Sequence, residues 1–148
     1  MSDTLSYRLN ECRFALPHSD VQDASINILK FAESGTSLIV SRSVLAKGET
    51  LRGNFDGQLK RLEQSVQALQ FQPFQTVFVG EAGSIEALEL LSQFSKASER
   101  VFQYQLVLVV PGTRQMLALS YVKAEPLGEA DAAHWAAIKG SLRFEAVL

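Results

Sequence analysis

The sequence predicts an α+β domain, in which an antiparallel β-sheet of about six strands carries a long central helix and a C-terminal helix. Three observations lead to this prediction. Short apolar segments recur along the chain and are separated by turn residues, as in a sheet of short strands. One segment has the three-and-four spacing of an amphipathic helix. A second helical segment follows the last strand, and this order is typical of an α+β domain.

The composition is that of a globular protein without a strong preference for charged partners. The 148 residues are 47% hydrophobic and 20% charged, and 14 basic against 16 acidic residues give a net charge of -2. A chain of this length buries roughly two thirds of its unfolded surface as one domain. The near-neutral balance argues against nucleic-acid binding, which usually depends on a basic patch. We therefore expect a single domain over residues 1–148 that binds no nucleic acid.

The N-terminal segment gives no sign of export. It contains no apolar h-region, no small-residue cleavage site and no lipobox-like cysteine. The single cysteine, Cys12, excludes an internal disulfide, in keeping with a reducing compartment. No window reaches the roughly 18 apolar residues that a membrane span needs. These features predict a cytoplasmic protein that does not insert into a membrane.

Two apolar strands within residues 25–44 are the most informative part of the chain, and a turn at Ser34–Thr36 joins them. Side-chain alternation places Ile26 and Ile28 on one face of the first strand. In the second strand it places Leu38 and Val40 together, and we assign them to the face of Ile26 and Ile28. The opposite face then carries Leu29, Phe31 and Ile39. Because both faces are apolar, each needs a cover.

The segments on either side of these strands are a short N-terminal strand region and a helix. Ser6 to Leu16 shows partial alternation and predicts one strand or a broken pair, ended by Pro17. From Thr50 to Gln70 the spacing predicts an amphipathic helix that covers one face of the sheet. Its apolar positions are Leu51, Phe55, Leu59, Leu62, Val66 and Leu69.

The second half of the chain predicts a run of strands and a final helix. The segment Ile85 to Phe94 favours helix by propensity. We interpret it as a strand because turns flank it and a clear strand follows. The other predicted strands are Thr76 to Val79, Val101 to Val110 and Met116 to Val122, and the last helix is Glu129 to Lys139 with Trp135 and Ile138 on one side.

The strand Val101 to Val110 has one mixed face. Gln103 and Gln105 share this face with Val107 and Val109, whereas the other face is apolar and aromatic. A buried glutamine without a hydrogen-bond partner is costly. Gln105 therefore lies near an edge and meets water, or lies under a partner that brings polar groups of its own.

The sequence contains no convincing catalytic or metal-binding pattern. Cys12, His18 and His134 are the only soft metal ligands, and their spacing does not resemble a metal site. No nucleophile elbow or phosphate-binding loop is present. We expect no enzymatic activity, no catalytic or metal-ligating residues and no cofactor.

If both helices pack on one face of the sheet, the other face, with Ile26, Ile28 and Val40, has no cover from its own chain. A helix about 10 Å across would cover about two strands, which lie about 4.8 Å apart. Strands of eight residues span roughly 26 Å, close to the roughly 30 Å of a membrane-spanning helix. Such a face could hold one hydrophobic helix.

Three segments carry a family resemblance: Tyr7-Arg8-Leu9-Asn10-Glu11, Gln22 to Ile28, and Ile39-Val40-Ser41-Arg42. With the amphipathic helix and the Gln105 strand, they resemble the DcrB-like domain of the effector-associated-gene (Eag) chaperones of bacterial type VI secretion. The resemblance implies a Mog1/PsbP-like fold. It also implies a homodimer that shields the N-terminal transmembrane helices of a toxic effector and helps to load that effector onto the VgrG spike.

The resemblance also implies the partner-binding residues. It places Ile26, Ile28 and Val40 on a groove floor, to which the strand pattern adds Leu38, and it gives Gln105 a hydrogen bond to the guest helix. On the amphipathic helix it points to Gln58 and Leu62. The alternative is a module that binds a lipid or another small apolar ligand, or that docks on a folded partner as Mog1-like proteins do. A deep closed pocket would favour the small ligand, and an open concave sheet would favour the helix.

Overall fold

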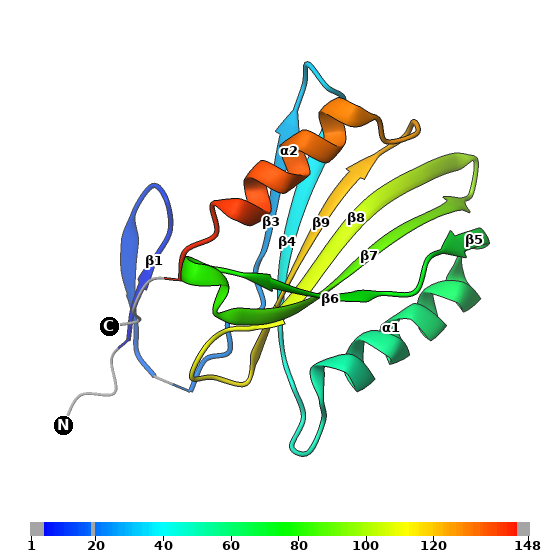
Figure 1. Cartoon of the computed structure of the whole chain (residues 1–148). Coiled ribbons are helices and arrows are strands. Elements are labelled where there is room, and N and C mark those ends of the chain that lie inside the picture. Colours follow the sequence, from blue (N-terminus) through cyan, green and yellow to red (C-terminus); the bar gives the residue numbers. More distant parts are fainter. Residues whose placement is uncertain (1–4, 19, 145–148) are drawn as a thin grey trace.

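The computed structural model describes residues 5–18 and 20–144 and confirms the α+β class. A seven-stranded sheet carries two helices, and a two-stranded hairpin lies to one side of it (Figure 1). The elements are β1 (Leu5–Arg8), β2 (Arg13–Leu16), β3 (Ile26–Phe31), β4 (Thr36–Val44), α1 (Leu51–Ser65), β5 (Gln67–Phe71), β6 (Gln75–Val79), a 3₁₀ turn (Glu81–Gly83), β7 (Ile85–Lys96), β8 (Glu99–Val109), β9 (Gln115–Lys123) and α2 (Glu129–Gly140).

The main sheet is antiparallel and has the strand order β3-β4-β9-β8-β7-β5, with β6 also paired to β7. The long strand β7 pairs with β6 through its first half and with β5 through its second half. The interpretation of Ile85 to Phe94 as a strand is therefore confirmed. One edge of the sheet is β3, which pairs with β4 alone among the described strands.

The two helices lie on opposite faces of the sheet, so the premise that both pack on one face is wrong. Trp135 of α2 packs against a core that includes Leu38 and Tyr121. Phe55 and Leu59 of α1 pack against a second core on the other face, formed with Leu88, Leu90, Val107, Met116 and Leu45. Each face thus has its own helix, and α2 extends along the strands on the near side in Figure 1.

Helix α1 begins where the sequence predicts but ends earlier. The Thr50 hydroxyl accepts a hydrogen bond from the Gly53 N–H at 3.0 Å, which caps the N-terminus. The backbone becomes extended at Val66, and Gln67–Phe71 forms strand β5 instead of a further turn of helix. Pairing with β7 and the positive φ of Ala68 (55°) replace the helical hydrogen bonds that the periodicity predicted. The prediction of helix up to Gln70 was wrong for this reason.

Helix α2 is fixed to the sheet by buried polar contacts. The Asp131 carboxylate accepts hydrogen bonds from the Gly128 N–H at 2.9 Å, the Lys123 ammonium at 3.1 Å and the Tyr121 hydroxyl at 3.2 Å. Burial alone would raise the pKa of Asp131, but these hydrogen bonds outweigh it and hold the pKa below its ordinary value. Further along the helix, the Trp135 indole N–H donates to Glu89 at 2.7 Å.

Candidate partner-binding face

The side of the sheet that carries α1 is only partly covered. Helix α1 packs over β7 and β8, and its core contacts reach β9 through Met116. The strands β3 and β4 on the same face lie beyond the helix. We call the uncovered part the open face. The residues that define it are Ile26 and Ile28 of β3, Ile39 and Ser41 of β4, Ser120 of β9, and Gln105 of β8.

The strand register defines this face. Residues that pair directly in an antiparallel ladder point to the same side of the sheet. Ile28 pairs with Ile39, Ile39 pairs with Ser120, and Ser120 pairs with Gln105. A single row of side chains therefore crosses the sheet from the β3 edge to the central strand β8.

The assignment of Leu38 and Val40 to the face of Ile26 and Ile28 is wrong. Leu38 pairs with Leu29, and Val40 pairs with Asn27, so both point to the α2 side. Leu38 is buried in the α2 core, and Val40 packs against that core. The four-residue turn between Phe31 and Thr36 sets this register, and a shift of one residue moves a whole strand's side chains to the other face.

The β3 side of the open face is strongly exposed and apolar. Ile26 is 61% exposed and Ile28 is 58% exposed, although both belong to a regular strand. Large aliphatic side chains in regular structure usually lie under a neighbouring element. Together they form an apolar patch beside the side chains that β4, β9 and β8 contribute to the open face, which we call the floor.

The opposite side of the open face is formed by one flank of α1. Asn54, Gln58 and Leu62 recur at four-residue spacing and form a partly buried stripe on this helix. The other flank, with Asp56 and Lys60, faces β5 and Phe74. The stripe therefore faces across the sheet towards β3, and the Gln58 amide donates to the Asn54 side chain at 2.6 Å.

The floor contains hydrogen-bonded polar side chains among the apolar ones. The Gln105 amide donates to the Ser120 hydroxyl at 3.3 Å, and the neighbouring Gln103 donates to Ser92 at 3.1 Å. Gln105 lies on β8, which has β9 and β7 on its two sides, so the alternative that it lies near a sheet edge is wrong. It is partly buried in the middle of the sheet.

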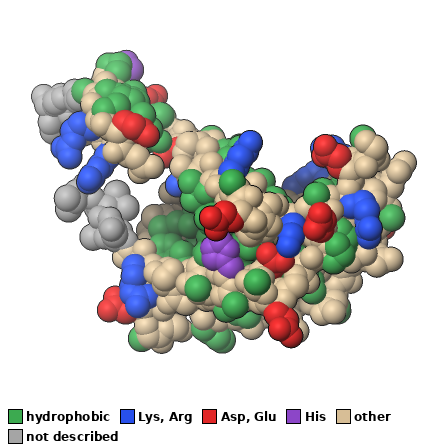
Figure 2. Space-filling model, turned by 90° about the horizontal axis from the view of Figure 1, so that it is seen from above, with side chains coloured by type: hydrophobic (Ala, Val, Ile, Leu, Met, Phe, Trp, Pro, Cys, Tyr) green, Lys and Arg blue, Asp and Glu red, His purple; other side chains and the backbone are tan. Residues whose placement is uncertain are grey.

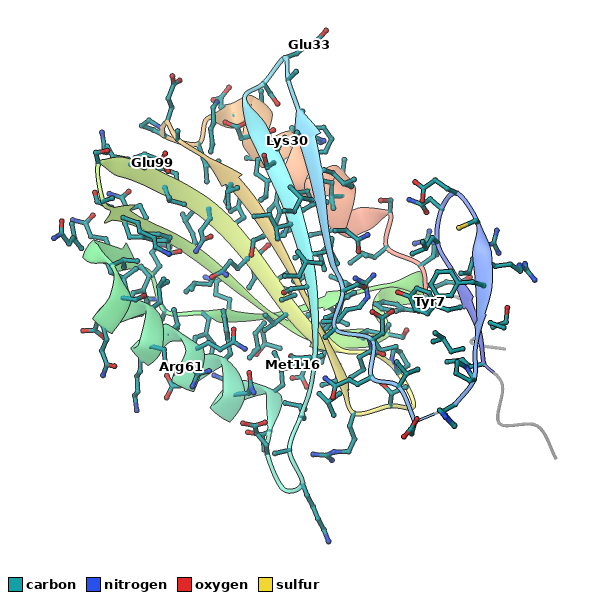
Figure 3. The ribbon with its side chains drawn as sticks, turned by 180° about the vertical axis from the view of Figure 1, so that it is seen from behind. Tyr7, Lys30, Glu33, Arg61, Glu99 and Met116 are labelled. Carbon is teal, nitrogen blue, oxygen red and sulfur yellow. The ribbon has the colours of Figure 1, made fainter. Side chains whose placement is uncertain are left out.

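On the open side of the sheet, the charged side chains of β3, β4, β8 and β9 lie only at one end of the strands. Among the described residues of β3, β4, β8 and β9, Lys30 and Glu99 are the charged side chains that the register directs to this face. The view from behind shows them at the same end of the sheet, with Arg61 on the outer side of α1 (Figure 3). In the view from above, charged side chains stand on both sides of a notch in the outline of the molecule (Figure 2). Because the register directs no other charged side chain of these four strands to this face, the floor suits an uncharged partner.

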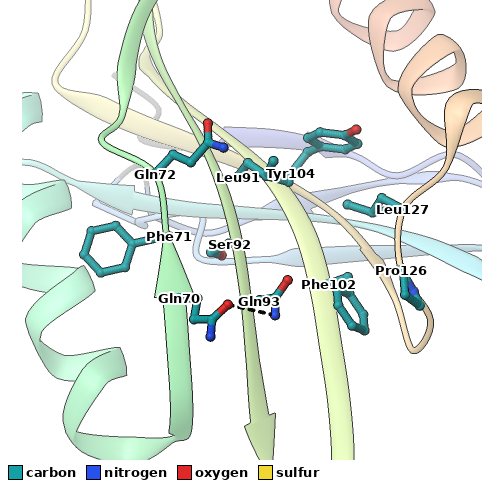
Figure 4. Close-up of a pocket in the computed structure, with 10 residues that line it drawn as sticks. All are labelled: Gln70, Phe71, Gln72, Leu91, Ser92, Gln93, Phe102, Tyr104, Pro126 and Leu127. Atoms are coloured by element: carbon teal, nitrogen blue, oxygen red, sulfur yellow. Dashed lines mark hydrogen bonds between the residues drawn. The ribbon is translucent and has the colours of Figure 1, made fainter.

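A separate depression of about 440 Å³ lies near β5. Leu91, Phe102 and Tyr104 line it together with Phe71 and the loop residues Pro126 and Leu127 (Figure 4). The register directs Leu91 and Tyr104 to the α2 side, so this depression is distinct from the open face. None of the sequence-predicted site residues lines it.

The structure thus brings Ile26, Ile28 and Gln105 to the open face and directs Gln58 and Leu62 towards it, whereas Leu38 and Val40 are directed away. The sequence interpretation missed Ile39 and Ser120. Ile39 was assigned to the wrong side because the register of the β3–β4 pair was unknown. Ser120 was not considered, and only its pairing opposite Gln105 distinguishes it from other strand serines.

Two further observations describe the chemistry that the chain presents. Within residues 5–18 and 20–144, no group of three or more His, Cys, Asp or Glu side chains is arranged to hold a metal ion. In the same part of the chain, no helix has the length and apolar character required to cross a membrane.

Comparisons with known proteins identify a family. A family model described as DcrB matches residues 11–141. Among solved structures, the crystal structure of a Pseudomonas aeruginosa protein of unknown function is similar, with 21% sequence identity and a TM-score of 0.70. The alignment covers 97% of this chain and 99% of that chain, which shows a shared fold. No curated protein matches the sequence.

Proposed function

The chain belongs to the DcrB family, and from this membership and the open face we propose that it is a cytoplasmic chaperone of type VI secretion. It binds the N-terminal transmembrane helices of a toxic effector and shields them from water before export. The observation that carries the proposal is the uncovered apolar pair Ile26 and Ile28 beside an uncharged floor. The assignment to the Eag chaperones and to the Mog1/PsbP-like fold rests on the resemblance in the sequence.

The dimensions of the open face suit one helix. On β4, the residues of this face from Ser37 to Ser43 cover six residue steps, or roughly 20 Å. The distance from β3 to β8 is three strand spacings, or roughly 14 Å, and a helix is about 10 Å across. Covering about 400 Å² of apolar surface contributes on the order of 10 kcal/mol before ordering costs. That contribution is large enough for stable capture of an apolar helix.

A homodimer forms part of the proposal. The outer edge of β3 has no strand partner among the described residues, and its side chains are exposed on both faces, with Leu29 50% exposed. Free edges of this kind pair readily with another strand. Antiparallel pairing of two β3 edges around a two-fold axis would join the two sheets and place the two open faces side by side.

The proposal assigns the chain a binding role. It contacts the VgrG spike through the bound effector. It uses no cofactor, catalyses no reaction, binds no nucleic acid and does not itself insert into a membrane. Its partner-binding residues are Ile26, Ile28 and Gln105 on the sheet and Gln58 and Leu62 on α1.

Co-purification tests the proposal. The tagged protein is purified from its own bacterium without detergent, and bound proteins are identified by mass spectrometry. We expect a large protein with apolar N-terminal segments, which is lost when Ile26→Asp and Ile28→Asp are combined. Leu62→Asp, on α1 and far from the β3 edge, should also lose it, which separates damage to the open face from damage to a dimer.

The matched control is Leu91→Asp, because Leu91 is also an exposed aliphatic side chain of a strand but points to the other face. This variant should retain the effector. Equal capture by wild type and the Ile26/Ile28 variant would contradict the proposal. Unfolding of that variant would show that the two isoleucines belong to the core.

The depression near β5 supports a second candidate function, binding of a small apolar ligand. Its volume of about 440 Å³ falls within the range of about 300–1,000 Å³ for ligand pockets. This candidate predicts a bound lipid in protein purified from its own bacterium, and Leu91→Asp would then remove the lipid. Extraction and mass spectrometry of small molecules from wild type and Leu91→Asp decide between the two candidates.

A further inference from the structure

The Gln105–Ser120 pair lies at the α1 end of the row of side chains that crosses the open face from Ile28. Gln105 has Ser120 opposite it on β9 and Leu90 opposite it on β7, and the next residue of this row, on β4, is Ile39. Both polar side chains are partly buried, so a guest on this face would complete their removal from water.

The hydrogen bond between the two side chains leaves them able to make further bonds. Gln105 Nε2 donates to Ser120 Oγ at 3.3 Å. A glutamine amide has two N–H groups and an acceptor oxygen, and a serine hydroxyl also donates. The bonded pair therefore still offers a carbonyl oxygen and a hydroxyl proton. If the amide were turned over, an N–H and a hydroxyl lone pair would remain instead, so the pair offers a donor and an acceptor in either orientation.

This remaining capacity affects which helices can cover the face. A buried polar group without a partner costs about 1–3 kcal/mol. A wholly aliphatic guest would impose that cost at Gln105 and Ser120. A guest helix with a hydroxyl or amide side chain at this position would avoid the cost, and a site that hydrogen-bonds its ligand discriminates strongly against an analogue without the polar group.

We propose that Ser120 is a positioning residue for guest selection. It holds the Gln105 amide against β9, so that the two side chains together select a helix with an uncharged hydrogen-bonding side chain where the helix crosses β8 and β9. This inference rests on the proposed function and adds a guest class to it. The guest has a Ser, Thr, Asn or Gln within an otherwise apolar helix.

A pair of model helices tests the inference. Two fluorescent 20-residue peptides of Leu and Ala, with lysines at both ends for solubility, differ only by a central Thr or the isosteric Val. Fluorescence anisotropy with the full chain gives the affinity for each peptide. The preference is the ratio of the two dissociation constants, Val over Thr. We expect Ser120→Ala to lower this preference about fivefold, because it removes one hydrogen bond of roughly 1 kcal/mol.

Matched variants separate positioning from a general change of the face. Ser120→Thr keeps the hydroxyl and should restore the preference. Gln105→Leu should lower the preference as much as Ser120→Ala does, and the double variant should lower it little further, since residues that act as a pair are not additive. Ser41→Ala removes a hydroxyl from the same face at a position paired with Ala118, and it should leave the preference unchanged.

An unchanged preference in Ser120→Ala, or an equal loss in Ser41→Ala, would overturn the role of Ser120. Failure of both peptides to bind the wild-type chain would overturn the proposed function and this inference with it. Binding of both peptides with no effect of Ser120 would overturn the inference alone.

Discussion

Ile28 lies directly opposite Ile39 in the β3–β4 ladder, and both side chains point to the face that α1 leaves partly uncovered. The next residues along the two strands, Leu29 and Leu38, pair on the other face. Adjacent residues on one strand therefore have different roles. The register pairs even-numbered residues of β3 with odd-numbered residues of β4, and this determines which residues reach the open face and which reach the α2 core.

The first prediction compares an aspartate on each of these faces. Ile28→Asp should lower the free energy of unfolding by less than about 1 kcal/mol, because the side chain is 58% exposed. Leu38→Asp should lower it by more than about 3 kcal/mol, because it buries a charge in the α2 core. Urea denaturation at pH 7 measures both values. Similar destabilisation by the two substitutions would show that the register is wrong.

The second prediction concerns the cap of α1, which holds one side of the open face. Thr50→Ala should lower the free energy of unfolding by about 1 kcal/mol, because the Gly53 N–H loses its acceptor. Thr50→Ser keeps the hydroxyl, and because serine caps helices at least as well as threonine it should leave the free energy of unfolding nearly unchanged. Thermal unfolding of the three proteins checks the order. If serine and alanine destabilise equally, the hydroxyl does not cap the helix.

The third prediction concerns the pH dependence of α2 anchoring. The pKa of Asp131 is held below its ordinary value in the folded chain by Gly128, Lys123 and Tyr121, although burial acts in the opposite direction. A carboxylate with a lowered folded pKa stabilises the fold above its unfolded pKa and loses that contribution as the pH falls through the folded value. The contribution is therefore complete at pH 7 and decreases below about pH 4.

Asp131→Asn should lower the free energy of unfolding by about 1–3 kcal/mol at pH 7, since Lys123 loses its buried partner. The difference between wild type and variant should shrink at about pH 3. Denaturation curves at both pH values measure it. Asp23 also has a lowered pKa, but it is present in both proteins and cancels in the difference. A difference that does not change with pH would exclude ionised Asp131 as the cause.

The sequence was sufficient to predict most element types, β5 excepted, but not how the elements face one another. Strand alternation correctly separated Gln105 from Tyr104, because that separation is a property of one strand. The relation of Ile28 to Leu38 depends on the turn between two strands, and the same alternation fits either register. The side of the sheet on which each helix packs depends on the whole topology. Residues 66–70 continue the helical spacing of α1, but pairing with β7 forms a strand there.

Of the seven predicted site residues, Leu38 and Val40 were assigned to the wrong face because the sequence does not define the register of the β3–β4 pair. Gln58 and Leu62 share one helical stripe with Asn54, on the flank of α1 away from β5 and Phe74. Ser120 could not be predicted at all, since a serine within an apolar strand carries no pattern. Its position opposite Gln105 emerges only from the β8–β9 register.

The last prediction concerns the proposed dimer and uses a residue outside the open face. Leu29 lies on the free β3 strand, is 50% exposed and points to the α2 side. In a dimer of paired β3 edges, Leu29→Lys would bring two lysines close to the two-fold axis, and charged edge residues oppose such pairing. Light scattering after size-exclusion chromatography should show a dimer for wild type and a monomer for Leu29→Lys. Leu91→Lys is the matched control, because Leu91 is exposed on the same sheet face but on the interior strand β7, and it should remain dimeric. A dimeric Leu29→Lys variant would exclude the β3 edge as the interface, and a monomeric wild type would exclude the dimer.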